Sequence, residues 1–321
     1  MSRPGDFWKS LSIALAVAGA ALAPTGAAVA ATLTNLYDFN LFSGDGRSPS
    51  GPLAFDGAGA LYGTTSNGGA HGLWGTVFKL TPPGDPSAPW PGSVLYSFTG
   101  GPDGGQPRSG VIFDRAGNLY GTTLVGATDA VGCGLYARRG CGTVFEGFPP
   151  ATPDGAWGGR LLHTFTGTPD GGNPGGLFLD PATGIIYGTT ETGGLPSDNC
   201  VAGYCGTVFS LTPPANPADP WTYSVIWQFP GGADGGNPSQ SARLVMDVSG
   251  ALHGTTQRGG ADGVGTLFQL TPGPAGYSLT TLWSFRGRTA IMTAIGFERA
   301  GPILKPLEQW RNSILRGNRR G

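Results

Sequence analysis

Charged and helix-favouring residues are scarce in this sequence. Only 12% of its 321 residues are Asp, Glu, Lys or Arg, and Lys, Glu and Gln, which favour helices, are few. Glycine and proline are abundant instead, at 59 and 28 residues. The glycines recur at fixed places between aromatic and β-branched runs, where they indicate turns. The composition therefore excludes long amphipathic helices and favours an all-β fold.

The small net charge of -1 hides an asymmetry. Residues 31–285 carry nine basic and seventeen acidic side chains, whereas residues 286–321 carry eight basic and two acidic ones. A nucleic-acid-binding domain would have clustered basic residues. The acidic body therefore excludes a nucleic-acid partner for the main part of the chain.

A hydrophobic run long enough to cross a membrane is also missing. The apolar stretch from Leu11 to Ala23 is shorter than the ~20 residues that a membrane-spanning helix needs. It follows basic residues and precedes the small-x-small sequence Ala28-Val29-Ala30, which predicts a signal peptide over residues 1–30 with cleavage near Ala30. We expect a mature chain without a transmembrane span that is secreted, periplasmic or at the cell surface. An uncleaved anchor is the alternative.

A composite motif occurs four times. It consists of Leu-Tyr-Gly-Thr-Thr, a Gly-rich gap and Gly-Thr-Val-Phe, and its copies begin at Leu61, Leu119, Ile186 and Leu252, with His253 and Leu267 replacing Tyr and Val in the fourth. Each copy follows a short apolar run that ends in an aspartate, with a Gly-containing turn between them, which is a hairpin signal. The four aspartates are Asp56, Asp114, Asp180 and Asp247. A fourth apolar run completes each unit, so each unit predicts four strands.

The fourth run has the most regular pattern, because two aromatic residues stand eight apart in every copy. The pairs are Trp90 and Phe98, Trp157 and Phe165, Trp221 and Phe229, and Tyr277 and Phe285. An even separation predicts that both aromatics lie on one face of a strand. The other face is apolar as well, which predicts an interior strand covered on both sides.

Units of 56 to 67 residues between successive phenylalanines, counted from Phe39, contain no helical segment. Four-stranded units of this kind predict a β-propeller-like repeat over residues 31–285, with about four blades and a partial fifth. Neighbouring blades would bury each other's apolar faces. An open β-solenoid is the alternative architecture.

The four cysteines lie in two of the Gly-rich gaps, Cys133 and Cys141 in one and Cys200 and Cys205 in the other. Three pairings are possible. Pairing within each gap would close an extended loop, so we predict Cys133–Cys141 and Cys200–Cys205 as disulfides in an oxidising compartment. The spacing does not fit a zinc site, and the three histidines have no metal spacing. We expect no metal and no cofactor.

The paired Tyr-Gly-Thr-Thr and Gly-Thr-Val-Phe motifs, together with Asp-Gly-Gly-x-Pro sequences such as residues 103–107, resemble the GloVer tandem-repeat family over residues 36–285. The resemblance implies a secreted or surface protein and carries no particular activity. Members of that family end in various anchors, whereas no recognisable anchor follows the last repeat here.

The last 36 residues, 286–321, do not continue the repeat. A fifth unit stops after Phe285 and a basic segment replaces it. Our hypothesis is that this tail is read out of frame, because the Gly-Arg-Thr-Ala sequence at 287–290 can be encoded so that a shifted frame reads Pro-Asp-Gly. A genuine basic segment that binds an anionic surface is the alternative.

Recurring polar residues are typical of structure here rather than catalysis. The aspartates of the Asp-Gly-Gly turns, Asp103, Asp170 and Asp234, are expected to cap their own turns. They lack the Asp-x-Asp-x-Asp pattern of a calcium loop, and a ring of carboxylates that binds calcium or carbohydrate is the alternative. The threonine pairs, such as Thr122-Thr123, are expected to form cross-strand hydroxyl bonds. No Gly-x-Ser-x-Gly sequence is present, so no catalytic residue is predicted.

Residues unique to one copy are better candidates for ligand binding. The gap loops contain His71, Trp74, Tyr136, Arg138, Arg139 and Tyr204. In a propeller these loops share one rim, where ligands commonly bind; variable surface loops are the alternative. We expect a non-enzymatic binding module for an extracellular or cell-surface ligand, either a glycan or a protein. The alternative is an extracellular polysaccharide lyase or hydrolase, which would need non-repeated carboxylates or a histidine close together.

Overall fold

The computed structural model describes residues 33–40, 44–126, 133, 139–152, 155–200, 203–241 and 243–286. The predicted signal peptide, Tyr136, Arg138 and the tail from residue 287 onward lie outside the described residues. The chain up to Asn35 is a unit of its own, of which residues 33–35 are described and belong to no helix or strand. The second unit begins at Leu36 and contains all the described strands. No α-helix occurs in the described ranges, and no helix there could cross a membrane.

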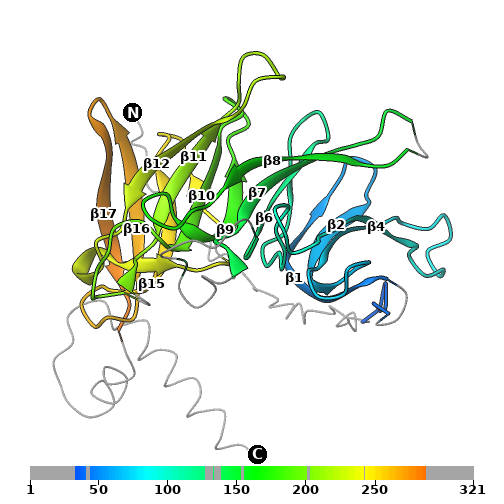
Figure 1. Cartoon of the computed structure of the whole chain (residues 1–321), viewed down its shortest axis with the longest axis horizontal. Coiled ribbons are helices and arrows are strands. Elements are labelled where there is room, and N and C mark those ends of the chain that lie inside the picture. Colours follow the sequence, from blue (N-terminus) through cyan, green and yellow to red (C-terminus); the bar gives the residue numbers. More distant parts are fainter. Residues whose placement is uncertain are drawn as a thin grey trace, which may run out of the picture. The chain divides into compact units, whose positions relative to one another are not determined.

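Four antiparallel sheets follow one another along the chain (Figure 1). Sheet 1 contains β1 (Gly46–Phe55), β2 (Leu61–Gly68), β3 (Thr76–Leu80) and β4 (Gly92–Ser97). Sheet 2 contains β5 (Ile112–Phe113), β6 (Leu119–Thr123), β7 (Thr143–Phe148) and β8 (Gly158–Thr164).

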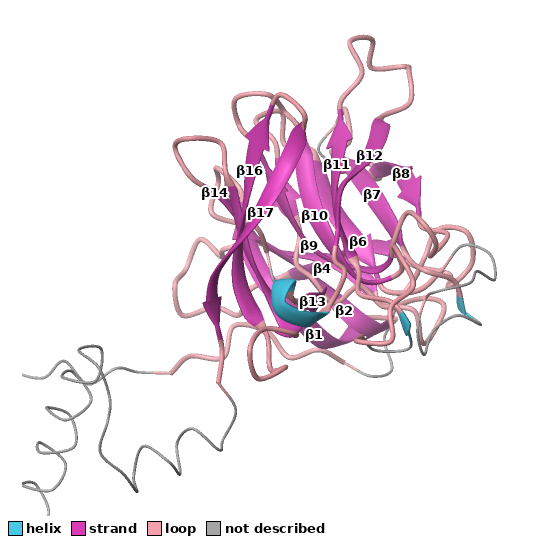
Figure 2. Ribbon diagram, turned by 90° about the vertical axis from the view of Figure 1, so that its left-hand side faces the viewer, coloured by secondary structure: helices cyan, strands magenta, loops and turns pink. Residues whose placement is uncertain are grey.

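The other two sheets repeat this arrangement. Sheet 3 contains β9 (Gly172–Leu179), β10 (Ile186–Thr192), β11 (Thr207–Thr212) and β12 (Thr222–Gln228). Sheet 4 contains β13 (Gly236–Pro238), β14 (Val245–Met246), β15 (Leu252–Arg258), β16 (Thr266–Gly273) and β17 (Gly276–Ser284), and the short 3-10 helix η3 (Gly232–Asp234) precedes it. In sheets 1 to 3 successive strands are neighbours, so each of these sheets is a meander (Figure 2). In sheet 4, β13 and β14 both pair with β15 and together take the place of the first strand.

The two halves of the motif pair with each other in every sheet. In sheet 2, Gly121 of β6 lies opposite Phe145 of β7, and a Cβ at Gly121 would lie 2.4 Å from Cζ of that ring. The next residue but one, Thr123, bonds the hydroxyl of Thr143 across the strands at 2.8 Å. The same hydroxyl contact occurs in the other three sheets, which confirms the predicted role of the threonine pairs.

The fourth strand is not interior, so that prediction is wrong. It is the outer edge of each sheet, and residues such as Tyr96 and Leu161 are more than two-fifths exposed. The middle strands are the buried ones, with β6 buried throughout. A β-bulge interrupts the pairing of the third and fourth strands in all four sheets. An extra residue reverses the inside–outside alternation beyond it.

Because of the bulge, the two aromatics of the fourth strand lie on opposite faces, not on one face as predicted. Trp157 of sheet 2 packs backward on Tyr62 of sheet 1, with ring centroids 6.0 Å apart. Phe165 of the same run packs forward on Phe209 of sheet 3, at 5.4 Å. The fourth strands of sheets 2 and 3 therefore each pack on the sheet before and the sheet after.

The first strand also differs from the prediction. The sequence predicts it as the short apolar run that ends in an aspartate, such as Leu53–Asp56 and Leu177–Asp180. In sheets 1, 3 and 4 the glycine–proline part of the preceding Asp-Gly-Gly-x-Pro turn already pairs with the second strand, as in Gly172–Leu179. The motif is therefore half turn and half strand, because its residues carry the chain across the end of one sheet and into the next.

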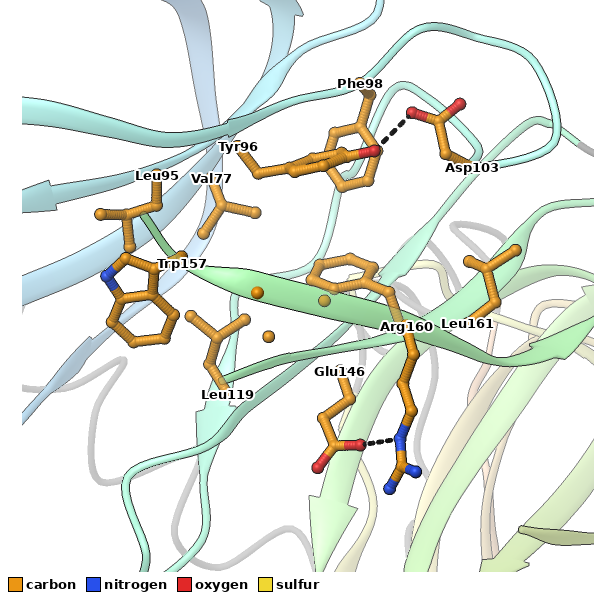
Figure 3. Close-up of a pocket in the computed structure, with 14 residues that line it drawn as sticks. Val77, Leu95, Tyr96, Phe98, Asp103, Leu119, Glu146, Trp157, Arg160 and Leu161 are labelled. Carbon is orange, nitrogen blue, oxygen red and sulfur yellow. Dashed lines mark hydrogen bonds and ion pairs between the residues drawn. The ribbon is translucent and has the colours of Figure 1, made fainter. Parts of the chain in front are cut away.

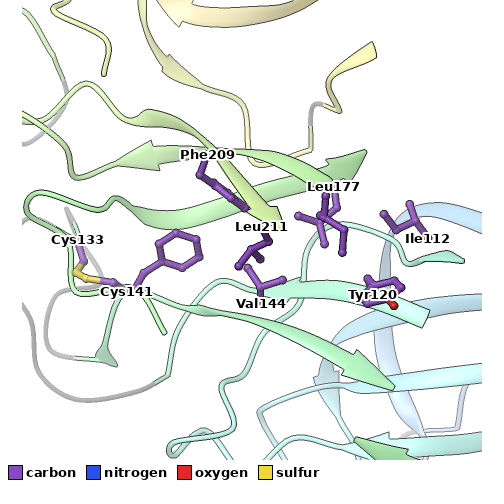
Figure 4. Close-up of a cluster of buried hydrophobic side chains, with 10 residues drawn as sticks. Ile112, Tyr120, Cys133, Cys141, Val144, Leu177, Phe209 and Leu211 are labelled. Carbon is purple, nitrogen blue, oxygen red and sulfur yellow. A yellow bond between two sulfur atoms is a disulfide. The ribbon is translucent and has the colours of Figure 1, made fainter. Parts of the chain in front are cut away.

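Junctions between consecutive sheets contain the hydrophobic core. Figure 4 shows the junction of sheets 2 and 3, where Tyr120 and Val144 meet Leu177, Phe209 and Leu211 beside the Cys133–Cys141 disulfide. Buried threonines tie the junctions together: Thr122 donates to the carbonyl of Gly175 at 3.0 Å. Edge-on phenylalanine pairs recur at each junction.

Residues 36–39 occupy the place of a fourth strand on the outer side of sheet 1. Phe39 packs edge-on against Phe78 at 5.0 Å, as Phe98 packs on Phe145. Tyr37 donates to Asp45 at 2.7 Å, as Tyr96 donates to Asp103. Similar four-stranded sheets, joined in series through one repeated junction, make the fold all-β and β-propeller-like, as the sequence predicts.

Candidate functional site

The repeated aspartates act as turn caps. Asp103 accepts the backbone N–H of Thr99 at 2.9 Å, and Asp170 accepts that of Thr166 at 3.0 Å. The glycine that follows each of them, such as Gly104 with φ 91°, has the left-handed conformation that glycine favours. Asp56, Asp114, Asp180 and Asp247 accept backbone N–H groups two residues on. The structural interpretation is confirmed for Asp103, Asp170 and the four strand-end aspartates, whereas the predicted cap at Asp234 stays a prediction.

The predicted loop residues are only partly within the described residues. His71 and Arg139 are exposed, Trp74 and Tyr204 are half-buried, and no hydrogen bond joins any two of their side chains. Tyr136 and Arg138 lie outside the described ranges. A ligand site formed by these residues stays a prediction.

Trp74 has a packing role between sheets 1 and 2. A Cβ at Gly100 would lie 2.1 Å from Cδ2 of the indole, and one at Gly105 would lie 3.0 Å from Cε3. The Trp74 carbonyl accepts the Gln106 N–H at 2.7 Å. The indole thus closes the end of the junction where the β2–β3 loop meets the next sheet.

The two predicted disulfides are confirmed and occupy the equivalent places at the next two junctions. Cys133–Cys141 and Cys200–Cys205 both have Cα atoms 5.1 Å apart. The Cys141 carbonyl accepts the Asn173 N–H, and the Cys205 carbonyl accepts the Asn237 N–H, each at 2.7 Å. A Cβ at Gly236 would lie 2.6 Å from Sγ of Cys200. The Trp74 indole and the two disulfides therefore close the ends of the three junctions at equivalent positions.

A polar cluster joins sheets 2, 3 and 4. Gln240 donates its Nε2 to Glu191, and Arg108 donates to Oε1 of Gln240 at 3.3 Å. Burial raises the pKa of the Glu191 carboxyl, against the opposing effects of the Gln240 hydrogen bond and the Arg108 charge. The Glu191 carboxylate is therefore partly desolvated, and its pKa depends on Gln240 and Arg108, which belong to two other sheets.

A hollow of about 750 Å³ lies between sheets 2 and 3. Its walls come from the β5–β6 turn, the β9–β10 turn and the start of β12, and Arg243 of sheet 4 borders it. Because it is at the end of the sheets that carries the first-to-second-strand turns, we call it the rim hollow. The predicted loops lie at the other end. Trp221 and Tyr120, with ring centroids 5.8 Å apart, are part of its lining.

Donors and acceptors of the rim hollow are unequally satisfied. Asp114 and Asp180 accept hydrogen bonds from their own turns. Arg115 and Arg243 are exposed and have no hydrogen-bond or ion-pair partner among the described residues. The indole N–H of Trp221 is buried and also has no partner. The hollow therefore presents unsatisfied donors and few free acceptors.

Tyr120 is the remaining titratable group of the rim hollow. Its hydroxyl donates to Asp114 at 3.0 Å and to Glu146 at 3.1 Å. Burial, followed by the nearby charges of Glu146 and Asp114, raises the Tyr120 pKa well above its usual range. The phenol stays protonated at neutral pH, so it is unsuited to act as a general base.

A second cavity, of about 270 Å³, lies between sheets 1 and 2. We call it the junction cavity. Figure 3 shows its apolar side chains, among them Val77, Leu95 and Trp157, with the Tyr96–Asp103 hydrogen bond at one side and the Glu146–Arg160 ion pair at the other. The ion pair has an Nε–Oε2 distance of 2.6 Å.

Glu191 is among the loop residues unique to one copy that the sequence singles out, but Arg115, Trp221 and Arg243 were missed as site residues. One signal could have found Arg115: it is a charged residue at a repeat position where the other copies have Gly57, Pro181 and Val248. Arg243 lies in a longer insertion after Pro238 than the other copies have. Among the described residues, no group of three His, Cys, Asp or Glu side chains is placed to hold a metal ion.

Comparisons with known proteins bear on the fold alone. No protein-family model and no curated protein matches the sequence. Solved structures with a similar strand arrangement include a hypothetical selenium-binding protein from Sulfolobus tokodaii (9% identity, TM-score 0.43, 73% of this chain and 54% of that one). Others are α-L-arabinanase from Cellvibrio cellulosa (13%, 0.38, 74% and 78%) and a protein of unknown function from Dyadobacter fermentans (13%, 0.43, 75% and 69%). This chain spans about half the length of the first.

Proposed function

We propose that the protein is an exported binding module that holds an acidic ligand in the rim hollow. The class of ligand is a carboxylated sugar of an extracellular polysaccharide. The observation that carries this proposal is the excess of unsatisfied donors, Arg115, Arg243 and the Trp221 N–H, beside carboxylates that are already bonded. The buried Trp221 N–H without a partner costs free energy that an acceptor-rich ligand would recover.

The chemistry of the donors favours a carboxylate. A guanidinium forms paired, parallel hydrogen bonds with a planar carboxylate, and two guanidinium groups can hold it from two sides. Aromatic and apolar walls with a few polar groups are typical of small-ligand sites. Export is supported by the two disulfides, which persist in oxidising compartments; the signal peptide and membership of the GloVer family remain predictions.

Binding to a polysaccharide tests this proposal. Calorimetric titration with polygalacturonate should give saturable binding, and an uncharged polysaccharide of similar length should bind at least about tenfold more weakly. The double variant Arg115→Gln/Arg243→Gln should lose the binding. The matched control Arg47→Gln/Arg258→Gln removes the same charge from other strands and should retain it. Equal affinity in both double variants would exclude the rim hollow.

An enzymatic role on the same polysaccharide is less well supported. A lyase needs a base beside the bound uronate, and the rim hollow offers Tyr120, held protonated, and Asp114, held by its turn. Incubation with polygalacturonate should therefore yield no unsaturated product by ultraviolet absorbance. Accumulation of that product would replace the binding module by a lyase.

A further inference from the structure

We propose that the junction cavity between sheets 1 and 2 is a second binding site, for a small neutral phenol. This inference is independent of the rim hollow. It follows from comparing one repeated position in the four sheets, where a side chain is present in some copies and absent in another.

The position is the second residue after the conserved aromatic that opens the fourth strand. Tyr223 stands there in sheet 3, and Leu279 in sheet 4. Both are packed into the junction with the preceding sheet. In sheet 2 the same position is Gly159, which lines the junction cavity. The cavity is therefore the space that a side chain would occupy.

Tyr223 shows what fits such a space. Its ring stacks on His163 with centroids 3.7 Å and planes 3° apart, and lies 5.9 Å from Phe165. It also lies 5.6 Å from Phe209. Its hydroxyl donates to the backbone carbonyl of Asp170. A phenol is thus held by one stacked ring, two phenylalanines and one carbonyl.

The junction cavity has the same four walls. Tyr96 stands at the place of His163, Phe98 at that of Phe165, Phe145 at that of Phe209 and Asp103 at that of Asp170, and all four line the cavity (Figure 3). The first sheet has a glycine at this position too, but the ring of Tyr37 covers it: a Cβ at Gly92 would lie 2.6 Å from Cε2 of Tyr37. The space beside Gly159 has no such cover.

The size and the lining charges of the junction cavity limit the class of ligand that it can bind. An apolar cavity of about 150 Å³ holds one benzene ring, so about 270 Å³ admits one ring with a short substituent. The Asp103 carboxylate at one side disfavours an anion, whereas the Glu146 carboxylate at the other side is paired with Arg160. The equivalent of the Asp170 carbonyl favours a hydroxyl donor. A neutral monophenol meets all three conditions.

Titration of the full mature chain with p-cresol tests the site. Calorimetry should show saturable binding, and 4-methylanisole, which lacks the donor, should bind about fivefold more weakly. Gly159→Tyr should fill the cavity and abolish binding, and a Cβ there meets only the Glu146 carbonyl oxygen at 3.2 Å. Absence of p-cresol binding by the wild-type chain, or unchanged binding by the Gly159→Tyr variant, would overturn the proposal.

A reciprocal variant separates the site from general stickiness. Tyr223→Gly opens the equivalent space between sheets 2 and 3, so a folded Tyr223→Gly chain should bind a second p-cresol. Circular dichroism checks that it folds, and a folded variant without a second site would overturn the argument from the repeat. Polygalacturonate affinity should be unchanged in Gly159→Tyr, so failure here is distinguishable from failure of the rim hollow.

Discussion

Single glycines decide which aromatic rings enter the space between and within the sheets. Gly121 makes room for Phe145, which lies directly opposite it. Gly159 leaves a cavity because no ring of its own sheet or the preceding one fills the space. The same residue type therefore admits a ring at one position and omits one at another. The two cases differ in whether a neighbouring ring reaches the space beside the glycine.

Gly121→Ala should destabilise the protein although alanine normally favours ordered backbone over glycine. The new methyl group would overlap Phe145, and overpacking of this kind costs about 1–3 kcal/mol. Urea unfolding measures the change. Gly57→Ala, where a Cβ meets nothing within 4 Å, is the control and should change stability by less than about 0.5 kcal/mol. Equal midpoints for the two variants would contradict the tight Gly121–Phe145 contact.

Glu191→Gln should raise the thermal midpoint at pH 7 and leave it unchanged at pH 4. Burial raises the Glu191 pKa in the folded state above its ordinary value of 4.5. The stability that this group contributes is therefore fully present below pH 4.5 and is lost as the pH rises through the folded pKa. Glutamine keeps an oxygen acceptor for Gln240 without the charge. A larger gain at pH 4 than at pH 7 would reverse the sign and refute the assignment.

Local contacts were predictable from the sequence at this scale, and distant ones were not. Asp114 caps a turn whose N–H groups come two and four residues later, so its role follows from neighbours in the chain. Glu191, Gln240 and Arg108 are 49 and 132 residues apart along their hydrogen bonds. The contacts among these three residues depend on how three sheets pack, which no local sequence pattern predicts.

At the scale of elements, strand pairing was predictable but the bulge was not. The two halves of the repeated motif are short strand-forming sequences bounded by turn residues. In sheet 2 they form β6 and β7. The bulge at Leu95, Leu162, Ile226 and Leu282 has no marker, because each of these residues is an ordinary apolar strand residue. One added residue moved the fourth-strand aromatics to opposite faces and made the parity argument fail.

The pair Cys200→Ser/Cys205→Ser should lower the free energy of unfolding by about 2 kcal/mol. Closing a loop of about five residues removes that much chain entropy from the unfolded state, and the bridge also packs on Gly236. Guanidinium unfolding measures it. Dithiothreitol should destabilise the wild-type chain further, because it also opens Cys133–Cys141. A reductant that leaves the wild-type midpoint unmoved would show that neither bridge supports the fold.

Across the whole molecule, the packing between consecutive sheets repeats, whereas the candidate ligand sites do not. Repetition made the series of four-stranded sheets predictable, since four copies state the same pattern. The rim hollow combines Arg115, Trp221 and Arg243 from three sheets. Trp221 stands at a repeated aromatic position, whereas the two arginines are not repeated in the other copies. A site of this kind follows from where the copies differ, so it needs coordinates before those differences can be placed together.

Sheet 4 exposes a face that the other sheets bury. Phe285 is 43% exposed, whereas its counterpart Phe98 is 1% exposed, and Leu282 and Trp283 are exposed as well. Among the described residues no further sheet packs on them, and apolar patches of this kind promote association. Leu282→Ser/Trp283→Ser should therefore reduce concentration-dependent self-association in sedimentation velocity. Val248→Ser, also exposed, is the control and should leave it unchanged.

Trp74 and the two disulfides, which close the three junctions, differ in their reactivity toward thiols. Trp74 is indifferent to thiols, whereas its two counterparts are covalent bonds that a thiol can cleave. In a reducing environment the junctions between sheets 2 and 3 and between sheets 3 and 4 would lose their disulfides and become less stable. The junction between sheets 1 and 2 would keep its indole and stay packed. Limited proteolysis in the presence of glutathione should then release an intact fragment from the first half of the repeats, so the chain carries a built-in order of disassembly.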